Sequence, residues 1–295
     1  MVTGRVWFIT GASSGFGRLM TELVLKNGDS AAATLRKPEA IADLSSQYGP
    51  DRLLVAKLDV TNNEEIKAAF NKAAAHFGRI DVVFNNAGYA LFGEAEGIPD
   101  DLAREAMEVD FWGAANVSRE AVRVFREVNK PAGGFLLQVS SASGLIGLPG
   151  LSYYCAPKHA LEGFTKGLAA ELNPEWNIKV CIVEPGGFRT PALSKMVHAP
   201  PHPAYMTPAS ATWRERERSK GVQYTPNMAD PATAVEMMYK ITSLPDPPIQ
   251  LPLGKDCLTM VRGTLAKLQR TVDAYASWSD ELQPEGEYQW ESMAS

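Results

Sequence analysis

Cysteine is scarce in this sequence of 295 residues, and the few thiols form no ligand pattern. The three cysteines, Cys155, Cys181 and Cys257, are an odd number without the spacing of a metal site. In a chain of this length such usage indicates reduced thiols in a cytosolic compartment. The four histidines are too scattered to gather around a metal ion. We therefore expect a cytoplasmic protein without a metal centre.

Long apolar runs and an excess of basic residues are lacking as well. The longest uncharged stretch, residues 133–157, is dense in Gly, Ser and Pro, which argues against a membrane span. The N-terminus enters a strand pattern at once and lacks the regions of a signal peptide. The net charge of −5 argues against nucleic acid as the main partner, because phosphate binding needs a basic surface. We expect neither a membrane span nor a nucleic-acid partner.

What the sequence does contain is an alternation of short apolar segments with amphipathic ones. The segments that read as strands are 6–9, 30–35, 52–58, 80–84, 135–140, 178–183 and 249–251. Helical apolar spacing fills the intervals, as in residues 63–77 and in the long stretch 99–129. This alternation predicts an α/β fold with a parallel sheet covered on both faces. Because no repeat or early linker interrupts it, residues 1–295 are expected to form one domain.

Residues 190–226 depart from this alternation. Prolines and methionines flank a charged stretch, residues 213–220, that is expected to form a solvated helix with opposite charges three residues apart. For the flanks we favour a substrate lid, because a long insertion at the carboxyl edge of a sheet is commonly functional. A closing helix is expected over 255–278, and the polar tail from about residue 279 is expected to be loose.

The first expected strand leads into Thr10-Gly-Ala-Ser-Ser-Gly-Phe-Gly17 and then into a helical pattern. A strand, a glycine turn and a helix bring backbone N–H groups and a helix N-terminus against a pyrophosphate. The spacing here is Gly-x-x-x-Gly-x-Gly, which differs from the Gly-x-Gly-x-x-Gly of other dinucleotide folds. The glycines alone could form a purely structural turn, but their position after the first strand favours a dinucleotide site.

Tyr154 and Lys158 lie four residues apart, and Ser141 precedes the tyrosine by thirteen residues. On one helix, this spacing puts the phenol and the ammonium on the same face. A phenol has an ordinary pKa of about 10, and a neighbouring ammonium lowers it, which suits the group to proton transfer. An aromatic residue and a lysine at this spacing are also common on ordinary amphipathic surfaces, so the pair depends on the motifs around it.

Six motifs, in this order and spacing, resemble the short-chain dehydrogenase/reductase family. They lie between residues 10 and 190 and are Thr10-Gly-x-x-x-Gly-x-Gly17, Asp59, Asn85-Asn-Ala-Gly88, Ser141, Tyr154-x-x-x-Lys158 and Pro185-Gly-x-x-x-Thr190. The resemblance implies a single-domain Rossmann-type fold and hydride transfer between a nicotinamide and a carbonyl or alcohol. Within the family, residues 154–163 and 34–36 look like the branch of 17β-hydroxysteroid dehydrogenases and related carbonyl reductases.

The resemblance also implies a role for each matched residue. Tyr154 would be the general acid in reduction and the base in oxidation, Lys158 would lower its pKa and bind the nicotinamide ribose, and Ser141 would hold the substrate oxygen. Thr190 would hold the carboxamide together with backbone near Val183 and Gly186. The other expected cofactor contacts are Gly11, Ser13, Ser14, Gly15, Phe16 and Gly17 in the glycine turn, Asp59 and Val60 at the adenine, and Asn86, Ala87 and Gly88 towards the adenosine ribose.

The choice of cofactor depends on the end of the second strand. Leu35 fills the place where an enzyme that prefers NAD usually has a carboxylate against the ribose 2′-hydroxyl. Arg36 follows it, and a guanidinium can bind a 2′-phosphate in bidentate fashion, with a further hydrogen bond from Ser14. Arg36 and Lys37 could also form no more than a charged loop. We expect NADP, reduced as NADPH, to be preferred over NAD.

Two positions depart from the family pattern. Asp110 of Asp110-Phe-Trp-Gly113 stands where the family usually has Asn, and it is included as a fourth catalytic residue. An ionised Asp only accepts hydrogen bonds, so a water relay to Lys158 would change its proton order. Pro157 replaces a small polar residue, and because proline is tolerated only in the first helical turn, the helix should begin near residues 152–154.

Together these features predict an NADP-dependent reductase of a ketone or aldehyde. The apolar residues expected at the pocket mouth favour a fairly lipophilic substrate: Leu145, Ile146, Leu148, Leu193, Met196 and Met206. Two alternatives stay open, namely a dehydrogenase that oxidises an alcohol or hydroxysteroid and a dinucleotide-binding sensor that has lost catalysis. The resemblance further implies a homodimer or homotetramer paired through its two long helices.

Overall fold

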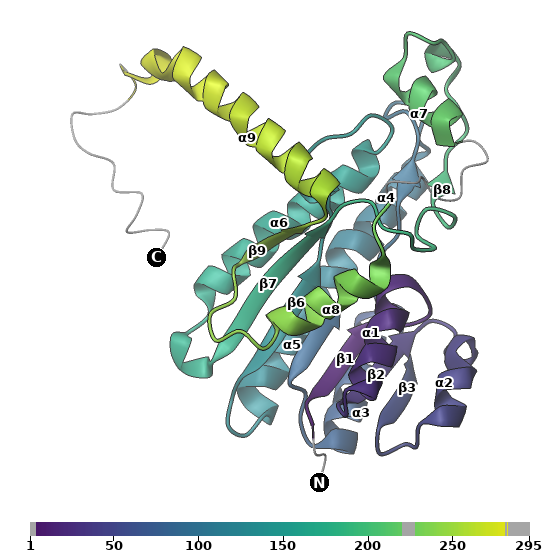
Figure 1. The fold of residues 1–295 in the computed structure, drawn as a ribbon, viewed down its shortest axis with the longest axis vertical. Helices are drawn as coiled ribbons and strands as arrows, with labels where there is room; N and C mark the ends of the chain where they lie inside the picture. The colour runs from purple at the N-terminus through teal and green to yellow at the C-terminus, as the bar shows by residue number, and fades with distance from the viewer. Residues whose placement is uncertain (1–3, 220–227, 281, 283–295) are drawn as a thin grey trace.

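A parallel sheet of seven strands forms the centre of the computed structural model, which describes residues 4–219, 228–280 and 282 (Figure 1). Its order is β3-β2-β1-β4-β6-β7-β9, and every neighbouring pair is parallel. The strands are β1 (Val6–Thr10), β2 (Ser30–Leu35), β3 (Leu53–Lys57), β4 (Val82–Asn85), β6 (Gly134–Val139), β7 (Ile178–Pro185) and β9 (Gln250–Leu253). The predicted α/β doubly wound fold is confirmed.

Helices cover both faces of the sheet because side chains alternate along each strand. On β1, Trp7 and Ile9 face one apolar cluster, while Val6 and Phe8 face the other. The first cluster is covered by α1 (Gly15–Lys26), α2 (Ala42–Gln47) and α8 (Pro231–Ile241). The second is covered by α3 (Asn63–Phe77), α5 (Ala114–Arg123) and α6 (Ser152–Glu171). Both faces of the strands are therefore buried, which explains their nearly continuous apolar sequences.

The strand order reverses direction at β1, whose neighbours are β2 on one side and β4 on the other. The chain moves outwards through β2 and β3 and then returns to place β4, β6 and β7 on the opposite side. In open α/β sheets, ligands bind outside the carboxyl ends of the strands at such a reversal. The fold therefore places the candidate site beyond Thr10, Asn85 and Val139.

The long helical stretch predicted over 99–129 is continuous but not uniformly α-helical. It begins as α4 (Asp100–Met107), passes through a π-helical segment at Glu108–Gly113, continues as α5 and ends in a second π-helical segment at Val124–Val128. The helix α6 begins at Ser152, within the predicted range, although Pro157 then lies in the second turn and not in the first.

A second, two-stranded sheet was not predicted from the sequence. It pairs β5 (Leu91–Phe92) with β8 (Val197–His198), and the N–H of Gly93 donates to the carbonyl of Gly150 at 2.8 Å. The loops after β4, β6 and β7 are thereby joined above the sheet. The expected lid continues into α7 (Ala211–Ser219), but residues 220–226 and most of the expected tail lie outside the described residues.

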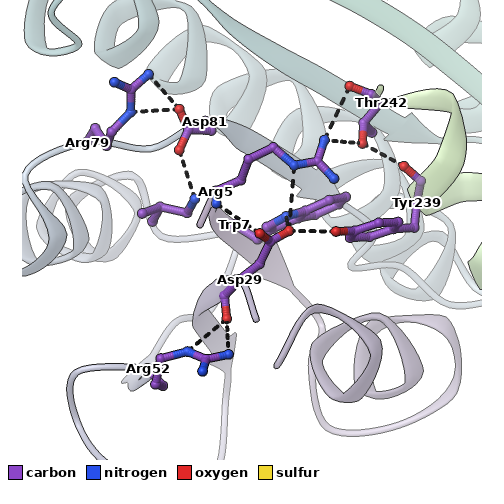
Figure 2. A network of polar contacts seen from close by, with 9 residues as sticks. Arg5, Trp7, Asp29, Arg52, Arg79, Asp81, Tyr239 and Thr242 are labelled. Carbon is purple, nitrogen blue, oxygen red and sulfur yellow. Dashed lines mark hydrogen bonds and ion pairs between the residues drawn. The ribbon is translucent and has the colours of Figure 1, made fainter. Parts of the chain in front are cut away.

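At the opposite end of the sheet, a polar network fixes α8 to β1 (Figure 2). The Asp29 carboxylate accepts hydrogen bonds from Trp7 Nε1 at 3.0 Å and from Tyr239 Oη at 2.8 Å. The Arg5 guanidinium lies over the rings of Trp7 and Tyr239, at 5.1 and 4.8 Å from their centroids, and donates to Thr242 Oγ1. Because this network lies at the amino ends of the strands, it stabilises the fold and is remote from the candidate site.

The last long helix, α9 (Lys255–Tyr275), projects away from the rest of the fold (Figure 1). Its first turns contact the body, and Cys257 is fully buried there. None of the described helices is long and apolar enough to cross a membrane.

Candidate active site

The glycine turn between β1 and α1 has the backbone that a close approach requires. Gly11 and Gly15 adopt positive φ angles of 68° and 56°, which side-chain-bearing residues rarely adopt. A Cβ on Gly17 would lie 2.2 Å from the carbonyl oxygen of Gly11, so only glycine fits there. The turn therefore leaves the N-terminus of α1 open to a phosphate group.

The end of β4 is held against the glycine turn by Thr10. Its hydroxyl accepts from the backbone N–H groups of Asn86 and Ala87, at 2.8 and 3.0 Å, and Asn86 Nδ2 donates to the Thr10 carbonyl at 3.0 Å. Asn85 is buried and donates to Gln138 Oε1 on β6 at 2.9 Å. Asn85 thus ties the strands together, whereas Asn86 and Ala87 lie next to the turn where the cofactor is expected.

A cavity of about 350 Å³ lies at the start of α1, lined among others by Ser13, Ser14, Gly15 and Thr190. A Cβ on Gly15 would lie 3.7 Å from Cβ of Thr190, so the loop after β7 faces the glycine turn directly. Phe16 packs edge-on against Phe188 of the same loop. These expected cofactor residues are brought together although the chain separates them by about 175 residues.

Ser14 is already engaged by a residue that the sequence did not single out. Lys195 Nζ donates to Ser14 Oγ at 2.9 Å, so a cation from the expected lid lies at the glycine turn. Two further cations line the cavity: Arg18 pairs with Glu22 and Asp43, and Arg189 pairs with Asp230. Lys195 forms no ion pair with the described residues and is therefore the most available of the three for an anionic ligand.

The adenosine end of the expected site is more open. Arg36 follows β2, is exposed, and makes no hydrogen bond or ion pair with residues 4–219, 228–280 or 282. Asp59 accepts from the N–H and the hydroxyl of Thr61, at 3.0 and 2.8 Å. Val60 is buried against Gly113, where a Cβ would lie 2.8 Å from Val60 Cγ2. Arg36 is thus a charged group whose hydrogen-bond donors remain for a ligand.

The backbone near Val183 and Gly186 is largely used by the sheet. The Val183 carbonyl accepts from the N–H of Ser140 at 2.8 Å, and the N–H of Gly186 donates to the Leu253 carbonyl at 2.8 Å. Thr190 is buried, and its side chain faces the glycine turn. Among the residues expected at the nicotinamide carboxamide, Thr190 is therefore the main candidate.

Ser141, Tyr154 and Lys158 meet at the carboxyl end of β6. Ser141 caps the short turn after this strand, where its Oγ accepts from the N–H of Ser143 at 3.1 Å. Lys158 is buried, and its Nζ lies 5.8 Å from the centroid of the Tyr154 ring. Burial and the nearby Asp110 carboxylate keep the pKa of the Tyr154 phenol above its ordinary value, although the Lys158 ammonium and the Ser141 hydroxyl act to lower it. The structure thus brings the three side chains named from the sequence together at one place.

Asp110 lies in the π-helical segment beside this group and is fully buried. Its Oδ1 accepts from the N–H of Tyr89 at 2.9 Å, while Oδ2 has no hydrogen-bond partner among the described residues. A Cβ on Gly88 would lie 2.7 Å from Asp110 Oδ1 and 3.3 Å from Lys158 Nζ, so Gly88 is the residue that allows these groups to converge. Burial raises the pKa of Asp110 to about 6, although the Lys158 ammonium and the Tyr89 N–H act in the opposite direction.

We expect Asp110→Asn to stabilise the protein above pH 6 and to have little effect below pH 4. The folded pKa of Asp110 lies above its ordinary value of 3.8, so the wild type loses stability between about pH 3.8 and 6, where the carboxyl ionises in the unfolded chain but stays protonated in the folded one, and the loss is complete above pH 6. The Asn amide does not ionise, so the variant loses no stability over this pH range. Its free energy of unfolding should exceed that of the wild type by up to about 3 kcal/mol. Urea unfolding at pH 4 and pH 8 measures it, with the exposed Asp100→Asn as control. A difference independent of pH would show that Asp110 has an ordinary pKa.

An ion pair that was not predicted from the sequence holds the expected lid to the loop after β4. Arg216 of α7 donates to Glu94 at 3.1 Å, and the two side chains are 12% and 2% exposed. Arg216 also donates to the Ala199 carbonyl and lies over the ring of Phe92. The expectation that the charged stretch is a fully solvated helix is therefore wrong for Arg216, because its acidic partner lies far back in the chain. Arg218 and Glu215 do form the expected surface pair.

The apolar residues expected at the pocket mouth are divided between buried and open positions. Ile146 is buried, while Leu145, Leu148, Leu193 and Met196 are half-buried. Met206 is exposed, with 52% of its surface accessible. Next to them, Tyr153 packs into an apolar cluster of the loops that includes Leu91, Ile98 and Ala199. No group of three metal-ligating side chains occurs within the described part of the chain.

Comparison with known proteins agrees with this geometry. The model of the family described as short chain dehydrogenase matches residues 5–200. An uncharacterized oxidoreductase of Schizosaccharomyces pombe is 41% identical over 256 residues, which are 86% of this chain and 83% of that protein. The crystal structure of a short-chain dehydrogenase from Streptomyces avermitilis is 34% identical, with a TM-score of 0.84 over 96% of this chain and 100% of that one.

A short chain dehydrogenase from Burkholderia cenocepacia, solved in complex with NADP, is 25% identical, with a TM-score of 0.70 over 93% of this chain and 98% of that one. NAD or NADP is the cofactor typical of this family, and the open glycine turn, the cavity at α1 and the buried Lys158 fit such a dinucleotide. The family match, the relative and the fold together identify this chain as an oxidoreductase that belongs to the short-chain dehydrogenase/reductase family.

Proposed function

We propose that this protein reduces a ketone or aldehyde on a fairly lipophilic small molecule, with NADPH as the hydride donor. The observation that carries the proposal is the convergence of Ser141, Tyr154 and Lys158 beyond the carboxyl end of β6. The nicotinamide supplies the hydride when it is bound, so this chain has to orient the substrate and move a proton.

In the proposed reaction, the Tyr154 hydroxyl donates its proton to the substrate oxygen as that oxygen gains charge. The Ser141 hydroxyl donates a hydrogen bond to the same oxygen and stabilises the developing charge. The Lys158 ammonium, 5.8 Å from the centre of the phenol ring, stabilises the phenolate that remains. Asp110 lies next to Lys158, and an ionised Asp only accepts hydrogen bonds. Asp110 can therefore return a proton to Tyr154, by way of the Lys158 ammonium, only when its own carboxyl group is protonated.

The preference for NADP is supported by the charges around the expected adenosine end. Arg36 has unoccupied donors, and Lys195 brings a second cation to Ser14. A 2′-phosphate adds two negative charges that these groups can bind, whereas NAD offers only a hydroxyl. The half-buried apolar residues after β6 and β7 support a lipophilic substrate, as in the branch of 17β-hydroxysteroid dehydrogenases and carbonyl reductases.

We expect Arg36→Leu to weaken NADPH binding by about 10- to 100-fold, the value of a lost charge-assisted contact, and to leave NADH binding unchanged. Fluorescence titration of both cofactors on the wild type and the variant measures this. Lys37→Leu is the matched control, because it removes the neighbouring exposed charge without removing the proposed contact. If the wild type binds NADH as tightly as NADPH, the proposals of NADP preference and of reduction both fail.

A further inference from the structure

The helix α9 carries an exposed apolar stripe that the active site does not use. Every residue from 262 to 275 is exposed, so this part of the helix packs on nothing within the described chain. An isolated helix of this length is marginal in water unless an apolar face is buried. The large exposed side chains include Leu265 at 60%, Leu268 at 58%, Val272 at 53% and Tyr275 at 53%.

The spacing of the stripe is that of a coiled coil. Apolar residues follow one another along α9 at alternating intervals of three and four, namely Leu258, Val261, Leu265, Leu268, Val272 and Tyr275. This is the a and d pattern of three heptads, and it forms one stripe roughly 100° wide. The apolar side chains of such a narrow stripe are buried best against a second helix that carries the same heptad pattern.

We propose that α9 pairs with α9 of a second copy of this chain in an antiparallel coiled coil. The second copy supplies an identical apolar repeat, so a two-fold axis makes the stripe complementary to itself. The body of each subunit is attached at the N-terminal end of α9, and a parallel pair would crowd both bodies at one end. An antiparallel pair separates them by about 30 Å, the length of the helix, and opposes the two helix dipoles.

The antiparallel register follows from the repeat. Leu265 faces Leu268 of the second copy, and Val261 faces Val272 of the second copy. Beside this seam, Arg262 lies opposite Gln269 of the second copy, so no like charges meet there. A surface-bound helix on a membrane would need a wider apolar face than this stripe of a and d positions offers.

The surface that two paired α9 helices would bury is modest compared with a standard interface of roughly 1,600 Å². We therefore expect association that depends on protein concentration. The proposal does not rest on the proposed reaction, because α9 lies outside the candidate site and its exposed part contacts none of the residues there.

Sedimentation equilibrium of the full chain tests the pairing. The double variant Leu265→Asp with Leu268→Asp should show a lower weight-average mass than the wild type, reaching half of it at concentrations where the wild-type pairing is saturated. The control is Ala266→Asp with Ala274→Asp, which adds the same charge to exposed positions off the seam and should keep the wild-type mass. Equal masses for both double variants would overturn the proposal, as would a monomeric wild type that sediments with anionic vesicles through the same leucines.

Disulfide trapping tests the register without relying on a destabilised variant. A mixture of Leu265→Cys and Leu268→Cys proteins should form a cross-linked heterodimer under mild oxidation, whereas each variant alone should not. The three native cysteines are buried and do not interfere. Cross-linking of Leu265→Cys with itself would indicate a parallel pair and overturn the antiparallel arrangement.

Discussion

Replacing Tyr154 by Phe is expected to lower the turnover of a carbonyl substrate by about 10²- to 10⁴-fold, the usual contribution of a positioned proton donor. The substitution removes only the hydroxyl, which forms a hydrogen bond with Ser141 and is attracted by the charge of Lys158. The binding of NADPH should change little, because the glycine turn and Lys158 remain. Steady-state kinetics on a panel of ketones and aldehydes, with cofactor titration alongside, measures both effects.

Tyr153→Phe is the matched control for this experiment. Tyr153 precedes Tyr154 on the same helix, but its ring packs into the apolar cluster of the loops and not towards Lys158. Its substitution should leave kcat within about twofold of the wild type, as expected for a side chain that moves no proton. Wild-type turnover in Tyr154→Phe would show that another group supplies the proton. A wild type that binds NADPH and reduces no carbonyl would favour the sensor alternative.

Replacing Arg216 by Met is expected to release α7 from the loop that contains Glu94. Among the described residues, the substitution leaves the buried Glu94 carboxylate with backbone N–H partners alone, namely its own N–H and that of His202 at 3.2 Å. Removing one partner of a buried ion pair costs about 3 to 5 kcal/mol. Hydrogen exchange of the α7 amides should therefore accelerate by at least about 100-fold, and KM should rise more than kcat falls, because the expected lid would no longer close over the substrate.

The second ion pair on α7 gives an internal control. Arg218 pairs with Glu215 on the surface, where the two side chains are 74% and 41% exposed. Exposed pairs contribute about 0 to 1 kcal/mol, so Arg218→Met should leave both hydrogen exchange and KM close to the wild type. Equal effects of Arg216→Met and Arg218→Met would contradict the anchoring role of the buried pair.

The candidate site could be predicted from the sequence wherever it depends on local spacing. Tyr154 and Lys158 share one face of α6 because residues four apart on a helix are neighbours. The glycine turn lies where the buried strand β1 leads directly into the helix α1, and it contains Gly11, Gly15 and Gly17. Pro157 predicted a start of α6 near residues 152–154 for an equally local reason, and the helix begins at Ser152, with the proline in its second turn.

The anchoring of the lid could not be predicted in this way. The strands β5 and β8 have two residues each, too few to show a periodicity, and they pair across about 100 residues of chain. The charges on α7 follow the pattern of a solvated helix, and only the folded chain brings Glu94 beneath Arg216. A sequence pattern indicates that a side chain is charged, but its burial depends on which distant segment lies against it.

The sequence by itself determined the order of strands and helices, the glycine turn and the spacing of Ser141, Tyr154 and Lys158, because each depends on neighbours within a few residues. The tertiary structure alone decided that Asp110 is buried beside Lys158 behind Gly88, and that the apolar repeat of α9 faces solvent. An apolar repeat looks the same in a sequence whether the body covers it or leaves it open. Its burial is a property of long-range packing, which only the folded chain defines.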